Sequence, residues 1–122
     1  MTLLIADDNP QMRRLTRSMI HDLAGDIYEC DDGGEAVECY RAHRPDWVLM
    51  DVRMKQVDGI TATREIKADF PEAKIVIVTN YDDPDLIELA MLAGATAYVT
   101  KAKLSDLRHI LIKNGAAPNS KN

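Results

Sequence analysis

Five polar residues that can do chemistry fall directly after short apolar runs in this sequence. They are Asp7 and Asp8 after the first run, Asp51 after the third, Thr79 after the fourth and Lys101 after the fifth. In open parallel α/β sheets, ligands bind beyond the carboxyl ends of the strands. If the runs are parallel strands, three carboxylates, a hydroxyl and an ammonium converge on one crevice. The set predicts a site, although no single member does.

The chemistry of this set is governed by charge. Three carboxylates a few ångströms apart repel one another, and one is pushed towards its neutral form unless positive charge offsets them. Lys101 supplies one positive charge, and Mg²⁺, which prefers carboxylate and phosphate oxygens, would supply two more. The balanced site would then suit a dianionic phosphoryl group, with Asp51 as the in-line nucleophile.

The elements that must position these residues follow from hydrophobic patterning. Five short apolar runs alternate with segments of helical period, and the runs cover residues 2–6, 27–30, 47–50, 74–78 and 95–100. Runs 47–50 and 74–78 are apolar on both faces, which is typical of parallel strands covered by helices on each side. The order predicts an α/β fold, a single (βα)5 doubly wound parallel sheet.

Helix boundaries are marked by capping residues. Asn9-Pro10 and Asp83-Pro84 each combine an N-cap with a first-turn proline, and Gly94 marks a helix end. Asp31-Asp32 also follows an apolar run, at the expected sheet edge, and we interpret this pair as turn and cap residues. We expect the folded domain to cover residues 1–114, with 115–122 as a linker or C-terminal tail.

Length and composition limit the alternatives. The chain has 122 residues, enough for one domain with its own core, and 46% of them are apolar. A net charge of −5 argues against non-specific nucleic-acid binding. We find no signal peptide or membrane span and expect a cytoplasmic protein with no membrane partner. Cys30 and Cys39 lack metal-ligand spacing, so we expect two reduced, buried thiols.

Taken together, these motifs resemble the receiver domain of two-component response regulators. The resemblance covers about 110 residues and rests on Asp7-Asp8, the stretch Asp51-Val-Arg-Met with Asp58-Gly59 after it, Thr79, Tyr98 and Lys101. It implies the flavodoxin-like strand order 2-1-3-4-5, which patterning alone does not give.

The resemblance assigns roles at the acidic cluster. Asp51 resembles the phosphoacceptor. Asp8 and Asp51 resemble carboxylate ligands of Mg²⁺, Asp7 acts largely through a metal-bound water, and the backbone carbonyl of Arg53 completes the protein ligands. We therefore expect Mg²⁺ to be the cofactor.

The resemblance also implies a switch. Lys101 would pair with the phosphoryl oxygens, Thr79 would donate its hydroxyl to the phosphoryl group, and Tyr98 would swing inward behind it. The surface of the fourth helix, fifth strand and fifth helix would then change shape. Simpler interpretations are open for two of these residues: Thr79 as a residue that only ends a strand, and Tyr98 as a residue that only fills the core.

The implied partner is a histidine kinase or phosphotransfer protein, with a possible homodimer on phosphorylation. Residues 92–101 resemble receivers that precede a helix-turn-helix DNA-binding domain, so we expect an output in transcription through a segment outside this chain. A stand-alone receiver acting by protein–protein contact, or a binding module that works without phosphorylation, are the alternatives. We expect a phosphoacceptor, with possible self-catalysed phosphorylation and dephosphorylation, rather than an enzyme.

Rival chemistries of similar sheets fit less well. A hydrolase with an aspartate nucleophile needs a second acid where Arg53 stands, and a nucleotide or flavin binder needs a Gly- or Ser/Thr-rich loop where Asp8-Asn9-Pro10 stands. Two positions depart from the receiver pattern, because Lys55 and Ala102 replace common prolines. A cis bond before a non-proline residue costs roughly 3 kcal/mol, so we expect Lys101–Ala102 to be trans in a rearranged loop.

Overall fold

Strands and helices alternate along residues 1–115, the part of the chain that the computed structural model describes. The elements are β1 Thr2–Ala6, α1 Pro10–Ile20, a 3-10 helix His21–Leu23, β2 Asp26–Cys30, α2 Gly33–His43, β3 Trp47–Met50, α3 Gly59–Asp69, β4 Ile75–Thr79, α4 Pro84–Ala93, β5 Ala97–Thr100, a second 3-10 helix Lys101–Lys103, and α5 Ser105–Lys113. The predicted fold class is confirmed.

The five strands form one parallel sheet in the order β2-β1-β3-β4-β5. The order agrees with the one implied by resemblance. The chain runs outward in one direction from β1 to β2 and then in the other from β3 to β5, so the order reverses between β1 and β3. A crevice at the carboxyl ends of these central strands is the expected ligand site of such a sheet.

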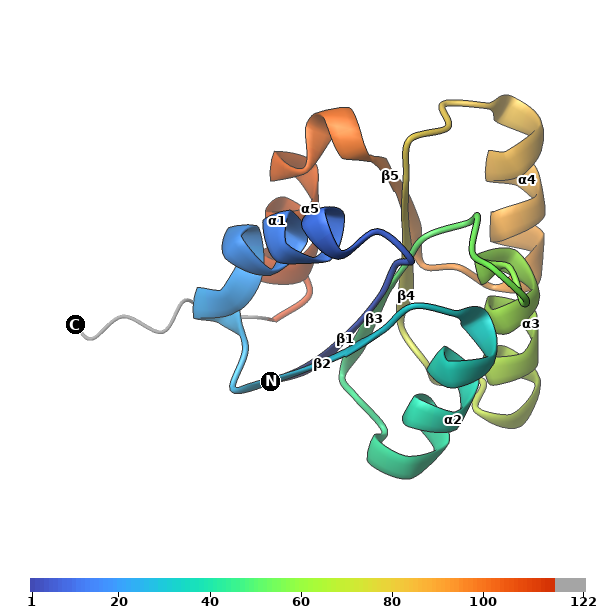
Figure 1. The fold of residues 1–122 in the computed structure, drawn as a ribbon, viewed down its shortest axis with the longest axis horizontal. Helices are drawn as coiled ribbons and strands as arrows, with labels where there is room; N and C mark the ends of the chain where they lie inside the picture. The colour runs from blue at the N-terminus through green and yellow to red at the C-terminus, as the bar shows by residue number, and fades with distance from the viewer. Residues whose placement is uncertain (116–122) are drawn as a thin grey trace.

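Helices cover both faces of the sheet, with α1 and α5 on one side and α2, α3 and α4 on the other (Figure 1). Alternate strand residues supply the two cores. Leu3, Ile5 and Leu49 pack on the α1/α5 side, whereas Leu4 and Met50 pack on the other. Because β3 is buried on both faces, its sequence is apolar throughout. Trp47, at the start of β3, is fully buried, and the Lys74 ammonium lies 4.9 Å from its ring centroid.

The predicted caps begin the helices. The side chain of Asn9 accepts hydrogen bonds from the backbone N–H groups of Gln11 and Met12, at 2.9 and 3.2 Å. The side chain of Asp83 likewise accepts from the N–H of Asp85 at 2.9 Å. Gly94 ends α4 with φ at +108°, a conformation that favours glycine.

The boundaries of β2, β4 and β5 differ from the prediction by one or two residues, and β2 begins one residue early, at Asp26. β4 covers Ile75–Thr79, so Thr79 is the last strand residue rather than the first residue after it. β5 begins at Ala97, two residues later than expected. The reason is the turn after Gly94, where the Ala95 N–H still bonds the Ala90 carbonyl of α4 at 3.0 Å.

α5 ends at Lys113, close to the expected domain end, and 116–122 of the predicted tail 115–122 lie outside the described residues. Within residues 1–115, no helix is long and apolar enough to cross a membrane.

One glycine fixes the loop between β3 and α3. A Cβ atom added to Gly59 would lie 1.7 Å from the backbone oxygen of Asp51. The Gly59 N–H also donates to the Val52 carbonyl at 2.7 Å. The start of α3 therefore packs directly against the end of β3, and no side chain fits between them.

Candidate functional site

A polar crevice of about 240 Å³ lies at the carboxyl edge of the sheet. Its lining residues come from the ends of β1, β3, β4 and β5, and they are Asp7, Asp8, Asn9, Asp51, Arg53, Asn80, Tyr81 and Lys101. The four charged residues predicted from strand-end position, Asp7, Asp8, Asp51 and Lys101, are thus brought together.

Lys101 bridges two buried carboxylates. Its ammonium lies 2.8 Å from Oδ2 of Asp7 and 3.1 Å from Oδ2 of Asp51. All three side chains are at most 9% exposed. From the sequence we expect Lys101 to pair with an incoming phosphoryl group, and its contact with Asp7 is an additional finding. In this structure the lysine compensates the two most buried acids of the site.

Burial and charge shift the pKa values of this group. Burial raises the pKa of Asp51, and the charge of Asp7 adds to this, while Lys101 opposes it without cancelling it. Burial alone would lower the pKa of Lys101, but the hydrogen bond to Asp7 and the charge of Asp51 outweigh it and leave that pKa raised. The lysine therefore stays charged. Ionised Asp51, by contrast, is destabilised by burial, and further positive charge in the crevice would reduce this destabilisation.

The three carboxylates form a compact oxygen cluster. One oxygen from each of Asp7, Asp8 and Asp51 lies within 4.8 Å of the others, and Asp8 is the most accessible of the three. Backbone groups hold the two buried acids in place. The Asn9 N–H donates to Oδ1 of Asp7 at 2.9 Å, and the Val52 N–H donates to Oδ1 of Asp51 at 2.8 Å. A set of fixed carboxylate oxygens fits a hard divalent cation such as Mg²⁺.

Thr79 lies beside the crevice but does not line it. Its side chain is fully buried, and its hydroxyl has no hydrogen-bond partner among residues 1–115. Thr79 is the last residue of β4 and is not among the residues that line the crevice, so the predicted contact of its hydroxyl with a phosphoryl group stays a prediction. A buried hydroxyl without a partner is costly, so it is available for a strong acceptor.

Tyr98 is partly exposed on β5, and its hydroxyl donates to the backbone carbonyl of Tyr81. Burial raises the pKa of Tyr98, with a further contribution from nearby acids, so its hydroxyl remains a donor. It also packs against the core on the α4 side of the sheet. Tyr98 thus links β5 to the loop after β4.

The side chain of Arg53 was not among the predicted site groups. Its guanidinium lies 4.7 Å from the ring centroid of Tyr81, and both residues line the crevice. No sequence motif identified this contact, since it joins two loops that follow different strands. Lys55, which stands where receivers commonly have proline, lines a separate pocket with Asp32 and Glu35.

The remaining loop prediction concerns Ala102. The Lys101–Ala102 peptide bond is trans, as expected, and the segment Lys101–Lys103 forms a 3-10 helix. The predicted turn-and-cap role of Asp31-Asp32 is confirmed for Asp32, which caps α2 through the Gly34 N–H at 2.9 Å. The same carboxylate also accepts from the Gln56 and Val57 N–H groups at 2.7 and 3.0 Å.

The fold and the crevice define a class: doubly wound α/β proteins with an acidic, lysine-bridged site at the reversal of strand order. Within that class, residues 3–112 match the model of the response regulator receiver domain. The chain belongs to this family, whose members act in two-component signalling.

Named relatives agree with this assignment. The chain is 43% identical over 107 residues to the transcriptional regulatory protein PdtaR of Mycobacterium tuberculosis, covering 86% of this chain and 52% of PdtaR. It is 38% identical to the chemotaxis protein CheY of Halobacterium salinarum, covering 81% and 82% of the two chains. The crystal structure of a LuxR-family two-component response regulator from Aurantimonas sp. SI85-9A1 superimposes with a TM-score of 0.82 at 32% identity, covering 97% and 89%. The chain thus spans about half the length of PdtaR.

Proposed function

We propose that this receiver domain accepts a phosphoryl group on Asp51 in a Mg²⁺-dependent reaction. The observation that carries the proposal is the crevice itself, where the Asp51 carboxylate lies 3.1 Å from the Lys101 ammonium and close to two further acids. A carboxylate with a raised pKa beside a fixed cation and an oxygen cluster suits charge-stabilised phosphoryl transfer.

The cofactor site would use groups already present in the crevice. The carboxylates of Asp8 and Asp51 and the backbone carbonyl of Arg53 would hold Mg²⁺, with Asp7 acting through a bound water. The bound ion supplies positive charge that offsets the charge on phosphoryl oxygens. Asp7 is fixed by Lys101 and by the Asn9 N–H, which fits a residue that orients a ligand rather than one that moves.

In the transfer, an Asp51 carboxylate oxygen attacks the phosphorus atom of a phosphohistidine. The new O–P bond forms as the P–N bond breaks, and its electron pair returns to the imidazole nitrogen, which takes up a proton. Lys101 stabilises the charge on the phosphoryl oxygens from the side of β5. The Val52 N–H holds Oδ1 of Asp51, so the carboxylate keeps its orientation during the attack.

The buried residue Thr79 supports a switch coupled to this reaction. A phosphoryl group adds about two negative charges and three strong acceptors. The Thr79 hydroxyl, which has no partner among residues 1–115, would reorient to donate to one of them. The space that it leaves would admit Tyr98, whose bond to the Tyr81 carbonyl would break. The surface formed by α4, β5 and α5 would change as a result.

The donor would be a histidine kinase or phosphotransfer protein in the cytoplasm, and the chain would act as a phosphoacceptor rather than as an enzyme that turns over. PdtaR is named a transcriptional regulatory protein and is about twice the length matched here, which supports transcriptional output through a further segment. CheY of Halobacterium salinarum, a chemotaxis protein, is matched over most of its length. That match supports the alternative, a receiver that signals by protein contact alone. Phosphorylation-dependent homodimerisation belongs to the same proposal.

The test is mass spectrometry of the intact protein after incubation with acetyl phosphate. We expect one added phosphoryl group with Mg²⁺, none with a chelator and none in Asp51→Asn. Asp31→Asn is the matched control, because it removes the same charge at a neighbouring strand end outside the crevice. Equal labelling of wild type and Asp51→Asn would refute the assignment of the phosphoacceptor.

A further inference from the structure

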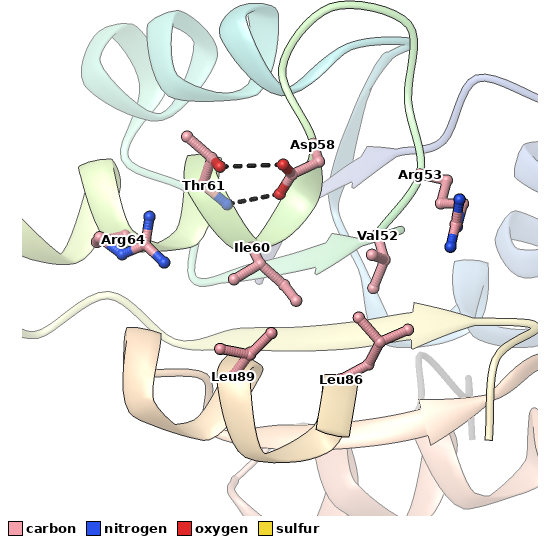
Figure 2. Close-up of a pocket in the computed structure, with 8 residues that line it drawn as sticks. All are labelled: Val52, Arg53, Asp58, Ile60, Thr61, Arg64, Leu86 and Leu89. Atoms are coloured by element: carbon pink, nitrogen blue, oxygen red, sulfur yellow. Dashed lines mark hydrogen bonds between the residues drawn. The ribbon is translucent and has the colours of Figure 1, made fainter. Parts of the chain in front are cut away.

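A second pocket lies beside the crevice, between α3 and α4. Its volume is about 350 Å³, within the range of small-molecule sites. Figure 2 shows Leu86 and Leu89 of α4 facing Ile60 of α3 across it, with Val52 next to them. Val52 and Ile60 are buried, whereas Leu89 is 48% exposed. The pocket therefore has an apolar floor and an open side.

Two arginines mark the ends of this apolar floor. In Figure 2, Arg64 of α3 and Arg53 of the preceding loop lie on opposite sides of Ile60. Among residues 1–115, neither guanidinium forms an ion pair with a carboxylate. Arg53 is engaged with the Tyr81 ring, so Arg64 is the freer of the two.

The pocket is lined by one carboxylate, that of Asp58, which already accepts two hydrogen bonds. Oδ1 of Asp58 accepts from the Thr61 N–H at 2.8 Å, and Oδ2 accepts from the Thr61 hydroxyl at 3.0 Å, since Asp58 caps α3. Its charge is directed at the helix start rather than at Arg64. With two arginines and one aspartate, the lining thus carries a net charge of +1 beside its apolar surface.

We propose that this pocket binds a small carboxylic acid with an apolar body. The carboxylate would bond the Arg64 guanidinium, which matches the geometry of a carboxylate with two parallel donors. The apolar body would cover Ile60, Leu86 and Leu89. A bare phosphate would leave this floor exposed to water, and an amphipathic cation would meet the wrong charge. The pocket shares Arg53 with the acidic crevice, but the proposed contact with Arg64 needs neither Mg²⁺ nor phosphorylation.

The experiment follows methyl resonances of the full chain by NMR in chelator, with 4-phenylbutyrate as the probe. We expect saturable shifts at Ile60, Leu86 and Leu89 with a Kd on the order of 1 mM, the range for a ligand of this size. The matched probe 4-phenylbutylamine, with the same apolar body and opposite charge, should shift these methyls far less. No shifts at these methyls with 10 mM phenylbutyrate, or equal shifts with the amine, would overturn the proposal.

Two substitutions test which positive charge binds the carboxylate of the probe. Arg64→Gln should weaken phenylbutyrate binding by about threefold to fivefold, as expected for an exposed ion pair. Arg14→Gln is the control, since Arg14 is exposed on α1, on the opposite face of the sheet. An equal loss in both variants would show a non-specific effect of net charge and would contradict the site. Because the measurement excludes Mg²⁺ and phosphodonor, its outcome is independent of the function proposed for Asp51.

Discussion

Replacing Asp8 by asparagine should stabilise the metal-free protein. Its carboxylate lies within 4.8 Å of oxygens of Asp7 and Asp51, which share a single lysine. Two like charges at this distance repel by about 0.9 kcal/mol in bulk water and about 3.5 kcal/mol at an effective dielectric constant of 20. Asp8 is the most accessible of the three, and Lys101 offsets part of the repulsion. We therefore expect a gain of about 1 kcal/mol, or about 3 to 5 °C in Tm.

Mg²⁺ should reverse the advantage. If the wild type binds the ion with a Kd on the order of 1 mM, 10 mM Mg²⁺ stabilises it by about 1.4 kcal/mol, because the folded state alone forms the site. Asp8→Asn lacks one proposed ligand and should gain less. The wild-type Tm should therefore rise by more than that of the variant when Mg²⁺ replaces chelator.

The assay is thermal unfolding followed by circular dichroism at neutral pH, in chelator and in 10 mM Mg²⁺. Asp31→Asn, which removes a carboxylate outside the crevice, controls for net charge. A Tm of Asp8→Asn in chelator that is unchanged or lower would refute the argument from repulsion. Equal Mg²⁺ stabilisation of wild type and Asp8→Asn would show that the ion binds elsewhere.

Three further outcomes follow from local contacts. Gly59→Ala should lower the free energy of unfolding in urea by more than about 3 kcal/mol, because its Cβ would overlap a backbone oxygen at 1.7 Å. Gly25→Ala, with its nearest contact at 3.7 Å, should change the free energy of unfolding by less than about 1 kcal/mol. Similar values for both variants would contradict the close packing. Asp32→Ala should cost about 2 kcal/mol in the same assay, since the carboxylate accepts three backbone hydrogen bonds, while Asp31→Ala should cost little. These bonds lower the pKa of Asp32 below 3.8, so the difference should persist above pH 4 and disappear as the pH falls through the lowered pKa; a difference that grows on acidification would be evidence against it. Burial raises the pKa of Cys30 to about 12, which lowers the fraction of thiolate at pH 8 about a thousandfold. Alkylation of Cys30 by iodoacetamide, followed by peptide mapping, should therefore be far slower in native than in urea-unfolded protein. Equal rates would show that the thiol is accessible.

The sequence was sufficient to predict the strands, helix starts and fold class of this protein, because the patterns that specify them are local. Runs such as Trp47–Met50 are apolar on both faces, and Asn9-Pro10 and Asp83-Pro84 start helices by bonds within one turn. Once the strands are parallel, their carboxyl ends share an edge. The grouping of Asp7, Asp8, Asp51 and Lys101 then follows from topology.

Contacts between loops could not be predicted from the sequence. The bond from Asp32 to the Val57 N–H spans 25 residues, and the stacking of Arg53 on Tyr81 joins two loops whose conformations patterning does not specify. The burial of Thr79 was missed because a shift of one residue in the end of β4 decides whether a side chain is in the sheet or beyond it. The pairing of Lys101 with Asp7 needed side-chain positions, since three acids competed for one cation.

The position of Trp47 has a practical consequence for these measurements. It is the only tryptophan of the chain and is fully buried at the start of β3, four residues before Asp51. At about 3.3 Å per strand residue, roughly 13 Å of backbone separate Trp47 from Asp51 in the crevice. Its emission should therefore change when the sheet melts and stay constant when an ion or a phosphoryl group enters the crevice. Tryptophan fluorescence is thus a reporter of unfolding in this protein and a poor indicator of ligand occupancy, for which a label on Tyr81 at the crevice is the better choice.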